Sequence, residues 1–167
     1  TQYIAPGQGF FVRVTDGNTN GTLQMTDAIR VHNDTEFFKN TNGNSFIRIY
    51  VNGNDLRDEA IIRFIEESTF EFDNNLDAYK RFNTDESYPQ IYTKIDEDYT
   101  INSIPTPEEV PMSFKCGVAA EYTISLSEIN NIGEVWLEDL FTGETTNITE
   151  NNYTFDHQTG ADPDRFV

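Results

Sequence analysis

Hydrophobic and polar residues alternate with period two over most of the chain, in short runs separated by Asn, Asp, Gly and Pro. The alternation is clearest over residues 122–127, and residues 47–52 repeat it. Because successive side chains of a strand point to opposite faces, this pattern predicts β-strands with one buried face. Further strands are predicted over residues 9–14, 22–31, 60–65, 135–137, 153–155 and 165–167.

Turn and helix signals complete this picture. Asp-Gly at 16–17 and Asn-Gly at 20–21 predict a hairpin between the first two strands. The prolines at 105–111 predict a connection or an edge, because proline cannot donate to a ladder of hydrogen bonds. One short helix is predicted over residues 76–82, with Asp73 or Asn74 as its cap. The sequence therefore predicts an all-β fold, an antiparallel β-sandwich of jelly-roll type with one short helix, as a single domain over residues 1–167.

The charge balance narrows the possible partners. The chain has 11 Lys and Arg against 29 Asp and Glu, a formal net charge of −18. A nucleic-acid binder needs clustered basic residues, so this class is excluded, and an anionic membrane surface is disfavoured for the same reason. No apolar run approaches the roughly 18 to 20 residues of a membrane-spanning helix, so we expect no insertion into a membrane. The 13 Phe and 8 Tyr suffice for an aromatic core.

Residues that could carry catalysis are few. Cys116 is the one cysteine and is predicted to be a small buried hydrophobe. His32 and His157 stand in polar, turn-like surroundings, which predicts exposed histidines rather than the base of a nucleophile. A pair of carboxylates could hydrolyse a glycoside, but among 29 acidic residues the sequence favours no pair. An enzyme is therefore the least favoured class.

Two acidic turns have the spacing of calcium ligands. From residue 16 to residue 27, oxygen side chains occupy the first, third and fifth positions, Gly the sixth and a carboxylate the twelfth, as in an EF-hand loop. The predicted ligands are Asp16, Asn18, Asn20, Thr22 and Asp27. The alternative is ordinary hairpin chemistry, because the flanks read as strands. Asp73, Asn75 and Asp77 repeat the alternate spacing, and there the alternative is a helix cap.

The one tryptophan is the leading candidate for a binding residue. If Val135 and Leu137 face the core, Trp136 faces the other side of the sheet. An outward tryptophan can stack on a sugar ring or dock a neighbouring domain, and the alternative is burial under a loop. Tyr92 and Tyr88 are further stacking candidates, with Asn and Asp side chains available to bind sugar hydroxyls.

Read together, these segments resemble a known family. Residues 3–12, YIAPGQGFFV, are similar to a hallmark of the β-rich region that precedes the sorting domain in large secreted and surface proteins of Bacteroidetes, the cargo of the type IX secretion system. Weaker matches follow in the family's order at 28–30, 37–38, 47–49, 59–64, 72–73, 77–78, 111–114, 122–124, 135–139, 153–155 and 164–166.

The resemblance implies a non-catalytic module of an exported protein, located outside the cell or on its surface. It implies a spacer, adhesin or carrier whose partners are the outer-membrane secretion machinery or neighbouring domains, and a chain that is part of a larger protein. The family defines no catalytic residues, so none is carried over. The alternative is a carbohydrate-binding module that holds a parent enzyme on polysaccharide.

Overall fold

The computed structural model describes residues 3–4, 9–10, 12, 14, 17, 19–31, 45–106 and 109–167. Contacts divide the chain into two units, Thr1–Asn42 and Gly43–Val167, and each is described by itself. The elements are η1 (Asp27–Ile29), β1 (Ser45–Gly53), β2 (Leu56–Phe64), β3 (Ala78–Tyr79), β4 (Gln90–Lys94), β5 (Asp98–Ile104), β6 (Met112–Lys115), β7 (Ala120–Asn130), β8 (Trp136–Asp139), β9 (Glu144–Asn147), β10 (Tyr153–His157) and β11 (Asp164–Phe166). The all-β class is confirmed.

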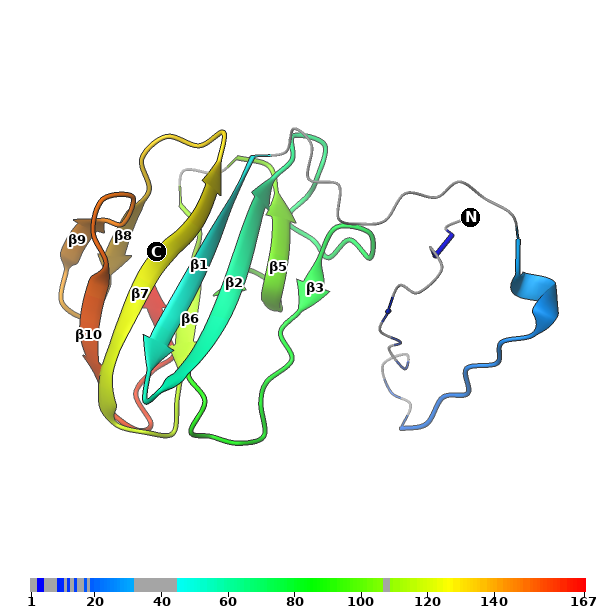
Figure 1. Ribbon diagram of the computed structural model, residues 1–167, viewed down its shortest axis with the longest axis horizontal. Helices are drawn as coiled ribbons and strands as arrows, with labels where there is room; N and C mark the ends of the chain where they lie inside the picture. The colour runs from blue at the N-terminus through cyan, green and yellow to red at the C-terminus, as the bar shows by residue number, and fades with distance from the viewer. Residues whose placement is uncertain are drawn as a thin grey trace. The chain divides into compact units, whose positions relative to one another are not determined.

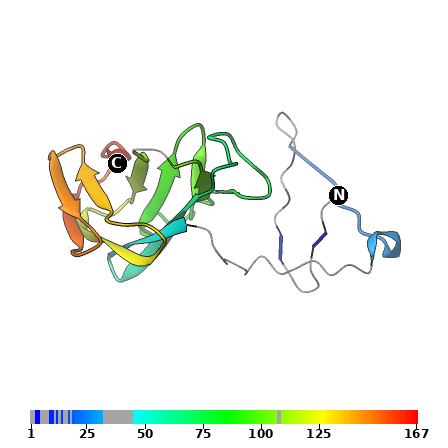
Figure 2. The same cartoon turned by 90° about the horizontal axis from the view of Figure 1, so that it is seen from above.

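The strands of the unit 43–167 belong to one mixed sheet, in the order β10-β7-β1-β2-β5-β4-β6-β11-β8-β9, with β3 added beside β5. Strand β2 pairs with β5 in parallel, whereas the other pairs are antiparallel. The period-two pattern does not separate these two arrangements, because side chains alternate in both. The sheet curls, so that β8 and β9 lie beside β10 at one side of the unit (Figures 1 and 2).

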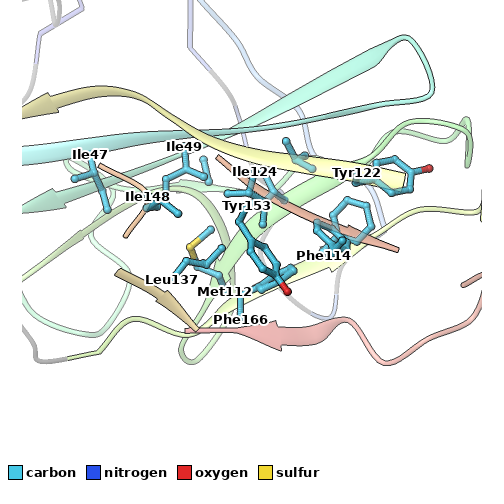
Figure 3. Packing of buried hydrophobic residues seen from close by; sticks show 14 of the residues in the cluster. Ile47, Ile49, Met112, Phe114, Tyr122, Ile124, Leu137, Ile148, Tyr153 and Phe166 are labelled. Atoms are coloured by element: carbon cyan, nitrogen blue, oxygen red, sulfur yellow. The ribbon is translucent and has the colours of Figure 1, made fainter. Parts of the chain in front are cut away.

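The core lies inside this curl. Ile47, Ile49 and Val51 of β1 point inward, and Ile49 and Val51 pair with Leu126 and Ile124 of β7. Figure 3 shows side chains of β1 and β7 pointing toward Met112 and Phe166 on the facing strands. Each alternating strand therefore contributes one apolar face, which is the origin of the period-two pattern.

Two predicted elements are wrong. The helix at 76–82 is absent: the N–H groups of Leu76 and Asp77 donate to the Asp73 carbonyl for one turn, after which the chain extends into β3. Pairing of β3 with β5 satisfies the backbone that a helix would have satisfied internally. The predicted strand 22–31 is absent as well: none of its residues is in a strand, and residues 27–29 form η1, where Arg30 N–H donates to the Asp27 carbonyl.

The described residues of the predicted strand 9–14, namely 9, 10, 12 and 14, are also outside any strand. A strand needs a neighbour to satisfy its N–H and C=O groups, and the described residues of the unit 1–42 contain no ladder. In the described part of the chain, no helix has the length and apolar composition needed to cross a membrane.

Candidate functional site

Trp136 is the most exposed aromatic side chain of the unit 43–167. It begins β8, where Leu137 and Asp139 point inward and are 2% and 0% exposed. Trp136 points to the opposite face and is 56% exposed, as the alternation predicts. Asn147 of the edge strand β9 lies directly across from it, and Glu138 is the next outward residue of β8. An indole, an amide and a carboxylate therefore share one outward face.

The structure does not place the other two stacking candidates beside Trp136. Tyr92, in β4, is only 4% exposed, because the chain before β4 covers it and the Phe82 ring packs edge-on at 5.1 Å between centroids. A sugar could stack on Tyr92 only after Phe82 had moved. Tyr88 precedes β4 and is half-buried. Trp136 is thus the one exposed ring of the three.

The first acidic turn is only partly described. Asp16 and Asn18 lie outside the described residues. Asn20 donates through Nδ2 to the hydroxyl of Thr19 at 3.3 Å. The Asp27 side chain is fully exposed and lies 3.7 Å from the Arg30 guanidinium. Thr22 is exposed as well.

The second acidic turn is held by backbone donors. The carboxylate of Asp73 accepts from the Asn75 N–H at 2.7 Å, while Asp77 accepts from the N–H groups of Asp73 and Ser103 at 2.8 and 2.7 Å. Burial raises the pKa of Asp77 and outweighs these hydrogen bonds, and the nearby Asp73 charge raises it further.

Calcium at either turn stays a prediction. Within the described residues, no group of three or more His, Cys, Asp or Glu side chains is arranged to hold a metal ion. In the second turn a cation would share the Asp73 and Asp77 oxygens with the backbone N–H groups that already bind them.

A buried ionic network anchors the strand that carries Trp136. The Arg165 guanidinium of β11 donates through Nε and Nη2 to the Asp139 carboxylate of β8, at 2.6–3.0 Å. The Tyr153 hydroxyl of β10 donates to the same carboxylate at 2.7 Å, and the Phe141 N–H does so at 2.9 Å. Burial raises the pKa of Asp139, but the donated hydrogen bonds, foremost from Arg165, hold it below its usual value.

This network also ties β10 to β8 and β11, two strands to which no backbone ladder joins it. Strand β10 pairs with β7, whereas β8 pairs with β9 and β11. Arg165 also donates through Nη1 to the Asp156 carbonyl in β10 at 2.9 Å. The network therefore links the two ends of the curled sheet. The only sign of it in the sequence is Arg165, which stands in the predicted strand 165–167.

A second buried cluster surrounds Cys116. The prediction that Cys116 is buried is confirmed, at 5% exposed. The Tyr122 hydroxyl lies 3.0 Å from the Cys116 Sγ and 2.9 Å from the Val118 carbonyl. Burial, together with the Cys116 contact, raises the pKa of Tyr122.

The prediction that His157 is exposed is wrong. It is 3% exposed, its Nε2 lies 2.9 Å from the Cys116 carbonyl, and its ring packs edge-on against Phe114. His157 ends β10 on its inward face, and alternation with Tyr153 and Phe155 is the signal that could have placed it there. His32 lies outside the described residues.

The fold and its outward aromatic face define an all-β domain built on one curled sheet. The chain belongs to the family described as Domain of unknown function (DUF8693), whose family model matches residues 1–167. Neither a curated protein nor a solved structure matches the chain.

Proposed function

We propose that this domain is a non-catalytic module of an exported protein, located outside the cell or on its surface and adjacent to a type IX sorting domain. It acts as a spacer, adhesin or carrier, and its partners are the outer-membrane secretion machinery or neighbouring domains. The sequence resemblance supports the location. The observation that carries the proposed mode of action is the exposed Trp136 on an anchored strand.

The anchoring matters because binding to a mobile side chain costs conformational entropy. Asp139 lies three residues after Trp136 in β8 and is fixed by Arg165 and Tyr153. Trp136 itself is held at the backbone by pairing with Asn147. A rigid strand that presents a large aromatic surface to solvent suits docking rather than core packing.

Localisation of the parent protein tests this proposal. An epitope tag placed in the parent protein beside this domain should be detected by antibody on intact cells of the native host. The signal should disappear from the surface of a strain that lacks type IX secretion, while the tagged protein accumulates inside the cell. A tag that stays inside secretion-competent cells would contradict the proposal. Hydrolysis of a polysaccharide that is lost on replacement of one carboxylate would contradict its non-catalytic part.

The second candidate function is polysaccharide binding, and the outward face of β8 and β9 favours it. Trp136 supplies a flat apolar ring, while Asn147, Glu138 and Thr145 on the same face supply an amide, a carboxylate and a hydroxyl. This combination matches a sugar, which has apolar ring faces and polar hydroxyl edges.

A pair of matched variants tests this alternative. Trp136→Ala should abolish retention of the parent protein on polysaccharide, whereas Leu140→Ala should not. Leu140 is the appropriate control because it follows β8 and is 54% exposed, close to the 56% of Trp136. Both variants should unfold near the wild-type temperature. Equal retention of the two variants would exclude Trp136 as the binding residue.

A further inference from the structure

The end of the β1–β2 hairpin forms a polar hollow on a different part of the sheet from Trp136. The hollow is a shallow depression of about 520 Å³ that is widely open to solvent. Its polar side chains are two amides, two carboxylates, one guanidinium and one hydroxyl, from Asn52, Asn54, Asp55, Glu121, Arg57 and Thr123. Donors and acceptors therefore converge on one concave surface, which distinguishes it from an acidic cluster.

The hairpin turn places the acidic residue Asp55 at a positive φ, a backbone conformation that glycine adopts without strain. Asn54 and Asp55 form the two-residue turn, with φ of +53° and +57°. Such a turn favours Asn followed by Gly, because a side chain at positive φ is strained. Asp tolerates this region when its carboxylate bonds to nearby backbone. Within the described residues, the Asp55 carboxylate accepts no such hydrogen bond. Local hydrogen bonding therefore does not explain why an aspartate occupies this position.

The surroundings of the turn fix its position. A Cβ on Gly53 would lie 2.2 Å from a ring carbon of buried Tyr122. The backbone at the end of β1 therefore packs directly against this core side chain. Asn54 Nδ2 donates to the Ser87 carbonyl at 3.4 Å, which ties the turn to a second loop. The hollow is therefore preformed, and a ligand would not have to order the hairpin.

Polar groups continue from the hollow across neighbouring strands. Asn52 of β1 lies between Arg57 of β2 and Thr123 of β7, and Thr123 lies across from Thr154 of β10. The two threonine hydroxyls are 3.1 Å apart. The Arg57 guanidinium stacks over the Tyr50 ring at 4.4 Å, which orients its donors. Of this row only Thr154 lies outside the hollow, so its hydroxyl extends the polar surface by one strand.

We propose that this hollow and the adjoining row bind an uncharged polysaccharide chain. Planar amide, carboxylate and guanidinium groups can each engage two hydroxyls of a sugar at once. The ligand should be uncharged because the chain carries −18 and the hollow itself has two carboxylates against one guanidinium. The proposal does not depend on where the parent protein is located or on Trp136.

Affinity electrophoresis of the full chain tests the proposal. Native gels would contain xyloglucan, galactomannan or laminarin, with alginate as the anionic comparison. Wild-type protein should be retarded in at least one of the three uncharged polysaccharides, relative to a gel without polysaccharide. Retardation in none of them, or in alginate alone, would overturn the proposal. Loss of retardation on addition of a chelator would overturn direct recognition of the sugar.

Asp55→Gly separates binding from folding. It removes the carboxylate and also relieves the positive φ, so the unfolding temperature should stay equal or rise while affinity falls about tenfold or more. Arg57→Lys, which keeps the charge but loses the planar fork, should also weaken binding at an unchanged unfolding temperature. Leu140→Ala is the matched control and should bind as wild type, because Leu140 is 54% exposed and lies outside the hollow. Undiminished binding by both hairpin variants would overturn the proposal, and if Trp136→Ala alone lost binding, the site would be assigned to β8 instead.

Discussion

At the scale of single residues, Asp139 is the side chain whose replacement we expect to destabilise the fold most. Its carboxylate is fully buried and accepts hydrogen bonds from Arg165 and Tyr153. Asp139→Asn should lower the free energy of unfolding by about 3–5 kcal/mol, because it leaves the Arg165 guanidinium buried without its counter-charge. Urea denaturation at neutral pH measures this. Glu144→Gln, an exposed carboxylate on β9, is the control and should change stability by less than about 0.5 kcal/mol.

The same residue predicts a dependence on pH. The pKa of native Asp139 is below its usual value, whereas in the unfolded chain it should be about 3.9. Protons therefore bind the unfolded state first, and the stabilisation from ionised Asp139 is complete above the unfolded pKa and lost as pH falls through the native pKa. The stability difference between wild type and Asp139→Asn should shrink below about pH 4. Urea unfolding of both proteins at several acidic pH values measures it, and a constant difference would contradict this account.

The sequence predicts the orientation of single side chains better than it predicts their contacts. Alternation predicted correctly that Trp136 faces outward, because that depends only on its own strand. It could not predict that Phe82 covers Tyr92, or that the Cys116 carbonyl meets His157, because both contacts join segments distant in sequence. The Asp139 network likewise joins three strands and leaves no local pattern.

At the scale of elements, the sequence predicted strands with one buried face and missed strands without that pattern, such as β4 and the partly exposed β9. Strand β1 alternates and was predicted, whereas residues 90–93 of β4 are all buried and do not alternate in polarity. The predicted helix does not form because the Asp77 carboxylate accepts from the Ser103 N–H of β5, and the chain that follows pairs with β5 as the strand β3. Both the missed strand β4 and the wrongly predicted helix depend on pairing with other strands. The local sequence does not show which strands will pair.

Gly53 gives a prediction at this scale, because it lets the end of β1 approach β7 closely. A Cβ there would be 2.2 Å from Tyr122 Cδ1 and 3.0 Å from the Glu121 carbonyl. Gly53→Ala should therefore destabilise the fold by about 1–3 kcal/mol through overpacking. The matched control is Gly133→Ala, where an added Cβ meets nothing within 4 Å. Thermal unfolding compares them, and equal midpoints would show that Tyr122 moves aside at no cost.

At the scale of the whole molecule, the dominant property is the net charge of −18. Self-repulsion at this charge destabilises the compact state, and salt screens it over a Debye length of about 10 Å at 0.1 M. Any cation therefore stabilises the fold to some extent. A specific calcium site must be distinguished from this general effect.

The decisive measurement is thermal unfolding after chelator treatment, with calcium then added at fixed ionic strength and magnesium as the matched ion. If the acidic turns at 16–27 and 73–77 bind calcium, the midpoint must rise, because a ligand that binds only the native state stabilises it by about 2.7 kcal/mol at a hundredfold excess over its dissociation constant. Magnesium should not reproduce the rise, because it demands a tighter octahedral shell. Asp77→Asn and Asp27→Asn then assign it to one turn, since only the variant of the occupied turn loses the calcium response. Equal shifts with both ions would reduce the effect to screening, and the turn at 73–77 would then be held by its hydrogen bonds alone.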